Sequence, residues 1–536
     1  MPTVIVNDVE IEIGPDEQIN GIQAAKRAGV EIPHYCWHPG LSVVASCRMC
    51  LVETGRKDPE SGDVSLVPKL VPACQTPATD GTVFVTDSQK VMDARAMVEE
   101  DLLIRHPIDC PICDKAGECT LQDYHFQHGR EERRADINPF TSRRRSLGDT
   151  VTLFVDRCVM CTRCVRFCRE VTETSELMVT NRGTDEEIDV FPGFPLDNKM
   201  SGNVVDLCPV GALGDKDFLY QQRVWFINKR SHVCAGCSTG CSIDIEENQD
   251  QIYRLKPRDN PHVNHWWMCD EGRYGWKHIH RADRHVQAYR QDQLDPVALD
   301  GTTLAEELDQ QLSSTATIAA VLSPHLTVEE AYLLATYVRS KDPAATLVLG
   351  HVPVQGENET YASGFTIRAE KCPNRRGVEE VIAGIAGEVI TWESFLESLS
   401  DSSPEAVWIA GGYKSDWHDD SVAQRFDSIP LRIIQDTFTS PLSRAATYSL
   451  PATAFAEQAG SFVNHEDHIQ SFEQAIRPPA GVIPAGQLYW RLLDRTGLYQ
   501  SQLVLAEIAR AIPYFNAATE PPGELGINLK LNHLAS

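Results

Sequence analysis

The chain of 536 residues lacks any apolar run of about 18 residues, the minimum for a membrane-spanning helix. It is also poor in basic residues, because 76 Asp and Glu outnumber 49 Lys and Arg and leave a formal charge of −27. Nucleic acids and anionic membrane surfaces are therefore poor partners. The beginning, "MPTVIVNDVEIEI", has no charged segment followed by an apolar one, so we expect no secretory signal and a reducing compartment.

Two further absences concern nucleotides and cysteine. Neither a G-x-G-x-x-G loop nor a Walker P-loop occurs, so nucleotide binding has no local support. Of the 17 cysteines, 16 precede residue 270, and almost all of these fall into tight groups. Disulfides do not persist in a reducing compartment, so the groups predict metal binding.

The first group consists of four cysteines, in "CWHPGLSVVASCRMC" and "VPACQTP". They are Cys36, Cys47, Cys50 and Cys74. An alternating segment at 3–13, a short helix ending at Gly29 and a strand in "GTVFVTD" surround them. This order resembles the β-grasp ferredoxins, which hold [2Fe–2S] in four thiolates, although the spacing differs from the plant-type run. A zinc ribbon remains an alternative, but only one Cys-x₂-Cys knuckle is present.

The second group combines one histidine with three cysteines. Apolar spacing in "VMDARAMVEEDLLIRH" predicts a helix that ends at Pro107. The candidate ligands in "HPIDCPICDKAGEC" are His106, Cys110, Cys113 and Cys119. A Cys₃His set suits zinc and also an iron–sulfur cube.

The third group, "RCVMCTRCVRFC", has the x₂, x₂, x₃ spacing of bacterial ferredoxins. There the fourth cysteine precedes proline, whereas here Cys168 precedes Arg169 and "LCPVGAL" offers Cys208 before Pro209. We therefore assign one [4Fe–4S] cluster to Cys158, Cys161, Cys164 and Cys208, and predict a structural role for Cys168.

The fourth group lies in "CAGCSTGC" and "MCDEGRYG". Its members are Cys234, Cys237, Cys241 and Cys269. The spacing resembles the N-terminal cluster domain of molybdopterin oxidoreductases, and a structural zinc site is the alternative. Working relatives commonly carry a lysine where this chain has Glu271, so we expect negative charge there in place of a cation.

The second half of the chain alternates strands and helices. "ATIAAVLSP", "TVEEAYLLATYVRS" and "ATLVLG" predict a βαβ unit with a parallel sheet, and "EAVWIAGG" and "LRIIQD" predict further strands. "YSLPATAFAEQAGSFVNHEDHIQSF" resembles a segment of the molybdopterin domain. Cys372 is the half's only cysteine, so we expect a structural domain without molybdopterin or substrate chemistry.

The string "HPIDCPICDKAGECTLQD" resembles the large iron–sulfur subunit of respiratory NADH:quinone oxidoreductase, complex I. The resemblance implies that His106 and its three cysteines hold a [4Fe–4S] cluster. With the other groups it implies one [2Fe–2S] and three [4Fe–4S] clusters in an electron-transfer subunit, with no catalytic residue of its own. The implied partners are the FMN- and NADH-binding subunit and the quinone-side Fe–S subunits, peripherally on the cytoplasmic side of the inner membrane.

The predicted fold is multidomain, α+β and α/β. We expect a β-grasp [2Fe–2S] domain at 1–85, a His-Cys₃ segment at 86–135, a ferredoxin-like [4Fe–4S] domain at 136–225, a molybdopterin-oxidoreductase-type [4Fe–4S] domain at 226–284, and a degenerate molybdopterin-oxidoreductase-like α/β domain at 285–536. Three alternatives stay open: a subunit of an NAD-linked molybdenum formate dehydrogenase, a related hydrogenase, and a zinc-bound scaffold without redox function.

Overall fold

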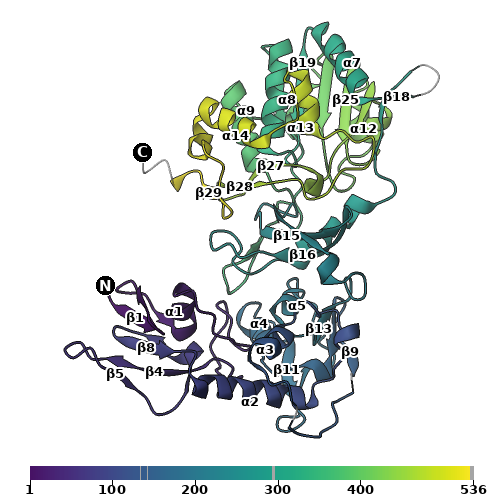
Figure 1. Ribbon diagram of the computed structural model, residues 1–536. Helices are drawn as coiled ribbons and strands as arrows, with labels where there is room; N and C mark the ends of the chain where they lie inside the picture. The colour runs from purple at the N-terminus through teal and green to yellow at the C-terminus, as the bar shows by residue number, and fades with distance from the viewer. Residues whose placement is uncertain (133, 142, 293–295, 532–536) are drawn as a thin grey trace. The chain divides into compact units, whose positions relative to one another are not determined.

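The computed structural model describes residues 1–132, 134–141, 143–292 and 296–531 (Figure 1). The chain forms two compact units. Unit 1 comprises Met1–Ile227 with Tyr361–Ser363, and unit 2 comprises Asn228–Thr360 with Gly364–Ser536. No helix in the described part of the chain is long and apolar enough to cross a membrane.

Unit 1 begins with the predicted β-hairpin. Strands β1 (Thr3–Val6) and β2 (Val9–Glu12) pair antiparallel around Asn7, whose φ of 52° suits a tight turn. Strand β8 (Thr82–Val85) runs parallel to β1 and pairs with β4 (Leu51–Lys57) on its other side, as Figure 1 shows. Because alternate residues of β1 are buried, this sheet has one core-facing side.

A short helix covers the core of this first sheet. Helix α1 (Gly21–Arg27) begins at a capping box, in which Asn20 and Gln23 satisfy each other's backbone N–H groups. It ends before Gly29, whose φ is 73°. Its apolar residues share one buried cluster with Phe84, Cys50 and Cys74, so two candidate ligands lie within the domain core.

Helix α2 (Gln89–Arg105) confirms the helix predicted from apolar spacing, and polar residues also lie on its buried face. The buried positions include Arg95 and Glu99, whereas Met97 is 57 % exposed. Glu99 accepts a hydrogen bond from the Tyr35 hydroxyl, and burial raises the pKa of Glu99 to about 7. The helix ends at Arg105, and His106 is its C-cap residue, so the helix determines where His106 lies.

The rest of unit 1 is built from short elements around the second and third cysteine groups. Helix α3 (Thr120–His128) packs against α2, and α4 (Arg163–Glu170) packs against α5 (Asn203–Leu207). The strands of this part form a three-stranded sheet, β9 (Arg144–Ser146), β10 (Val151–Phe154) and β13 (Leu213–Asp215), and a hairpin, β11 (Leu177–Thr180) and β12 (Glu187–Val190).

Unit 2 begins with a three-stranded antiparallel sheet that carries the fourth cysteine group. Its strands are β14 (Asn228–Val233), β15 (Ser242–Asn248) and β16 (Gln251–Pro257). Buried polar side chains join this sheet to the C-terminal part of the unit. The Ser242 hydroxyl, for example, donates to Gln470 Oε1 at 2.6 Å. The cysteine-bearing sheet and the α/β part are therefore one folding unit.

The α/β part is an eight-stranded sheet covered on both faces. The predicted βαβ unit is confirmed, because β19 (Ile318–Leu322) and β20 (Thr346–Leu349) are parallel neighbours joined by α8 (Val328–Lys341). Strands β24 (Ala406–Ala410) and β25 (Leu431–Asp436) extend the parallel run. Successive residues of β19 belong to two separate core clusters, as in a three-layer fold.

Candidate metal centres

The structure brings the four cysteines of the first group together. Side-chain hydrogen bonds join Cys36 to Cys47 and to Cys74, and Cys50 to Cys74. Those from Cys47 and Cys74 hold the pKa of the Cys36 thiol well below its usual range. Cys36 also accepts backbone hydrogen bonds from Ser46 and Cys47. The four side chains are thus close enough to bind one metal group, and Cys36 is the thiol most readily deprotonated to the thiolate that binds metal.

Two arginines of α4 attach this first loop to the third group. The Arg166 guanidinium, 2 % exposed, donates to the carbonyl oxygens of both Cys36 and Cys161. Arg163 Nη2 donates to the Trp37 carbonyl at 2.5 Å, and its Nη1 donates to the Leu207 carbonyl at 3.3 Å. The two ligand loops are therefore held together by buried positive charge, which the sequence pattern did not reveal.

His106, Cys110 and Cys119 line one cavity of about 350 Å³. His106 caps the C-terminus of α2, and Cys119 precedes the first residue of α3. Burial lowers the pKa of His106 to about 4, so the imidazole is neutral and able to bind a metal. Cys113 does not line the cavity, but its charge acts on the Cys119 thiol.

The second and third groups approach each other closely at Gly211. A Cβ atom on this glycine would lie 2.2 Å from Cys113 Sγ, so only glycine fits there. Nearby, the Thr120 N–H donates to the Pro209 carbonyl at 2.9 Å. The guanidinium of Arg157 also pairs with Asp109 at 2.9 Å. The residues between Cys208 and Leu213 thus form part of the wall of the second group.

Cys208 joins Cys158, Cys161 and Cys164 in the folded chain. Burial raises the pKa of the Cys158 thiol, and the charges of Cys161 and Cys208 raise it further. Met160 and Thr162 take positive φ values of 48° and 58°, which turn the loop back around the thiols. The Met160 N–H donates to Cys158 Sγ at 3.4 Å.

Cys168 lies on the same helix as Cys164, but its thiol has another neighbour. Burial raises the pKa of Cys168, and the next contribution comes from the charge of Glu176. The thiols of the third ligand set are not among the groups that shift the pKa of Cys168. The charge of Cys168 also raises the pKa of Cys164 less than the charges of Cys161, Cys158 and Cys208 do.

The fourth group lies at the turn between β14 and β15 and at the start of α6 (Asp270–Tyr274), and all four cysteines line one small cavity. The Gly236 N–H donates to Cys234 Sγ at 3.4 Å, and the Gly272 N–H donates to Cys269 Sγ at 3.3 Å. A Cβ on Gly272 would lie 3.0 Å from Cys234 Sγ. Because Gly236 and Gly272 have no side chains, the loops leave room around these thiols for a bulky group, and their backbone N–H groups donate to the sulfur atoms.

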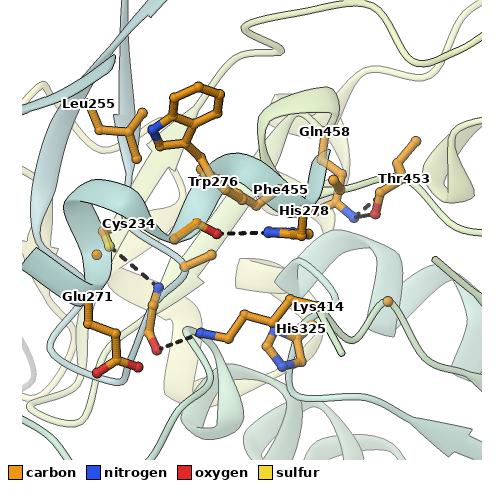
Figure 2. Close-up of a pocket in the computed structure, with 16 residues that line it drawn as sticks. Cys234, Leu255, Glu271, Trp276, His278, His325, Lys414, Thr453, Phe455 and Gln458 are labelled. Atoms are coloured by element: carbon orange, nitrogen blue, oxygen red, sulfur yellow. Dashed lines mark hydrogen bonds between the residues drawn. The ribbon is translucent and has the colours of Figure 1, made fainter. Parts of the chain in front are cut away.

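A second cavity adjoins the fourth group and shares Cys234, Gly236, Glu271 and Gly272 with it. Figure 2 shows Lys414 reaching into it, and Lys414 Nζ lies 3.5 Å from the Gly236 carbonyl oxygen. The Glu271 carboxylate pairs with Lys371 Nζ at 2.6 Å. Glu271 does place a carboxylate at this position, but two lysines distant in sequence, Lys371 and Lys414, bring positive charge to the site.

The donor chemistry of all four sets suits iron–sulfur clusters. Each set offers thiols in loops with backbone N–H donors, the arrangement that stabilises clusters and tunes their potentials. Throughout the residues that the structure describes, no three His, Cys, Asp or Glu side chains converge on a point where a single metal ion could bind. The ligand sets remain predictions.

Comparison with known protein families assigns most of the chain. Residues 3–89 match a 2Fe-2S iron-sulfur cluster binding domain, and residues 95–134 match the NADH-ubiquinone oxidoreductase-G iron-sulfur binding region. Residues 148–214 match the ferredoxin-like domain of NADH-quinone oxidoreductase subunit 3. Residues 230–281 match the molybdopterin oxidoreductase Fe4S4 domain, and residues 280–489 match the molybdopterin oxidoreductase family. The predicted multidomain fold class is confirmed.

Curated relatives agree with these family matches. The G subunit of NADH-quinone oxidoreductase from Rickettsia felis is 35 % identical over 271 residues, which are 51 % of this chain and 39 % of the relative. The corresponding protein of Pseudomonas fluorescens is 33 % identical over 343 residues, covering 62 % and 36 %. The mitochondrial 78 kDa subunit of NADH-ubiquinone oxidoreductase from Candida albicans is 36 % identical over 274 residues, covering 51 % and 36 %. The chain is thus related to these large subunits, but it spans less than two fifths of their length.

One solved structure, an NAD⁺-reducing [NiFe]-hydrogenase in the H₂-reduced state, is also similar. It is 26 % identical with a TM-score of 0.34, and the match covers 42 % of this chain and 91 % of that one.

Proposed function

We propose that this protein is the electron-transfer subunit of an NADH:quinone oxidoreductase and holds one [2Fe–2S] and three [4Fe–4S] clusters. The observation that carries the proposal is the gathering of thiols far apart in sequence, such as Cys36 with Cys74 and Cys158 with Cys208, within a chain related to the large subunits of that enzyme. A bound iron–sulfur cluster supplies one-electron transfer. The protein's part is to hold each cluster, exclude water and set its potential.

The described residues support this part in three ways. Most candidate thiols are buried, so solvent is kept from the clusters. Backbone N–H groups donate to Cys158, Cys234 and Cys269, which favours the reduced state of a thiolate-bound cluster. Arg166 fixes the first and third loops to one another, which keeps the gap between their clusters constant.

The partners and location follow from the same relationship and belong to the proposal. The FMN- and NADH-binding subunit delivers electrons, and the quinone-side Fe–S subunits accept them. The chain sits peripherally, through these subunits, on the cytoplasmic side of the inner membrane.

The proposal predicts the metal content. One two-iron and three four-iron clusters give about 14 irons per chain. Inductively coupled plasma analysis of anaerobically purified assembly, normalised to protein by amino-acid analysis, measures this number. Stoichiometric zinc in any set would contradict the assignment, and it would favour the scaffold alternative. Aerobically purified protein serves as the control for oxidative cluster loss.

A molybdenum enzyme is the second candidate, because residues 280–489 match the molybdopterin oxidoreductase family. We propose that this domain holds no molybdopterin and is structural. The expected result is neither molybdenum nor tungsten at stoichiometric level in the intact assembly, and no formate oxidation with an artificial electron acceptor. Stoichiometric metal together with formate oxidation would favour the formate dehydrogenase alternative.

A further inference from the structure

We propose that Lys414, from the α/β part of unit 2, is the residue that holds up the reduction potential of the cluster in the fourth cysteine set. The inference rests on the proposed function, since it requires a [4Fe–4S] cluster between Cys234 and Cys269. It assigns Lys414 a positioning and electrostatic role toward that cluster.

Lys414 reaches the cluster loop from the carboxyl end of strand β24. Its Nζ lies 3.5 Å from the carbonyl oxygen of Gly236, and the N–H of the same Gly236 donates to Cys234 Sγ (Figure 2). Lys414 thus contacts Gly236, which in turn contacts the thiol of Cys234. Within the described part of the chain, no carboxylate lies within 4.0 Å of Lys414 Nζ, so its positive charge is not neutralised by an ion pair.

The loop that presents Lys414 is held in place by a buried carboxylate. Asp436, at the end of β25, accepts hydrogen bonds from the Gly412 and Tyr413 N–H groups at 3.0 and 3.2 Å. It also accepts one from Trp417 Nε1 at 2.8 Å. A Cβ on Gly411 would lie 2.9 Å from the same carboxyl group. The backbone on both sides of Lys414 is therefore fixed, which lowers the entropic cost of keeping its ammonium group at the cavity.

The other charged or histidine side chains that line the cavity are neutral or paired, and the nearby carboxylate of Asp436 is hydrogen-bonded to the loop that carries Lys414. Glu271 pairs with Lys371 at 2.6 Å, and Arg284 pairs with Glu457 at 2.5 Å. Burial first, and then the charge of Lys414, lower the pKa of His278 to about 4 and that of His325 to about 3. Among the described residues that line this cavity, Lys414 is the single unpaired cation.

An unpaired cation beside Cys234 has a definite effect on electron affinity. Reduction adds one electron, and with it one negative charge, to the cluster and its four thiolates. A nearby positive charge stabilises the more negative state, and a cation at a partly enclosed cavity is screened less than one at the surface. Removing the charge should therefore make the cluster harder to reduce.

The test is a redox titration of the intact, anaerobically purified assembly, followed by electron paramagnetic resonance. The signal of this cluster is identified as the one lost in Cys269→Ser. Lys414→Met should shift its midpoint to lower potential, and Lys414→Arg should restore it. The matched control is Lys229→Met, which removes a 61 % exposed lysine of the same unit and should leave the midpoint unchanged.

A second variant keeps the test decisive if Lys414→Met loses the cluster. Glu271→Gln leaves Lys371 unpaired and should shift the midpoint upward. Unchanged midpoints in Lys414→Met and Glu271→Gln, with the signal present, would overturn the inference while leaving the proposed function intact. If the signal is lost in Lys414→Met and the midpoint of Glu271→Gln is unchanged, the inference also fails. Zinc in place of iron at this set in the unmodified protein would instead overturn the proposed function.

Discussion

Replacing Cys208 by serine should remove one [4Fe–4S] cluster from the assembly, whereas replacing Cys168 by serine should leave all clusters in place. Cys208 lies outside the compact cysteine run, but its charge acts on the thiols of Cys158, Cys161 and Cys164. Cys168 belongs to the run, but its thiol lies beside Glu176 and is fully buried in the packing of α4. The two variants make the same chemical change at two buried sites.

The measurement is the set of electron paramagnetic resonance signals of the reduced assembly, together with iron per chain. Cys208→Ser should lose one cube, about four irons, while the [2Fe–2S] signal persists. Cys168→Ser provides the matched control and should contain as much iron per chain as the unmodified protein. If Cys168→Ser loses a cube and Cys208→Ser retains it, the third ligand set is wrong.

Local patterns in the sequence were sufficient to predict several of the strands and helices. The alternation at 3–12, the apolar spacing at 91–105 and the strands of the βαβ unit all appear in the structure, because each depends on neighbouring residues. Which residues of α2 are buried could not be predicted in the same way. Its Glu99 is buried because Tyr35, 64 residues earlier, donates a hydrogen bond to it, and such a partner leaves no local signal.

The same limit applies to the charges around the candidate sites. Cysteine spacing identified which thiols to group, but not the arginines that fix the loops together. Arg166 contacts Cys36 across 130 residues. Lys371 contacts Glu271 across 100 residues. A lysine missing from one motif position was therefore no evidence that positive charge was missing from the site, since tertiary structure brings charge from other elements.

Removing the carboxylate of Glu457 should destabilise unit 2 strongly. Glu457 accepts two hydrogen bonds from Arg284, at 2.5 and 2.9 Å, and the two side chains are 1 % and 2 % exposed. Arg284 also donates to the carbonyls of Ile279 and Ala452, so the pair joins the segment after the fourth cysteine set to the α/β part of the unit. Glu457→Ala would leave a buried, uncompensated guanidinium, at a cost of about 3–5 kcal/mol.

Urea-induced unfolding followed by tryptophan fluorescence measures this loss, because seven of the chain's nine tryptophans lie in unit 2. The matched control is Glu466→Ala, whose 60 % exposed carboxylate lies 3.9 Å from Arg368 and should contribute less than about 1 kcal/mol. The double variant Arg284→Met/Glu457→Leu should recover most of the loss, since apolar residues of similar size leave no charge to desolvate. Equal unfolding midpoints for Glu457→Ala and Glu466→Ala would mean that the buried pair does not hold these two segments together.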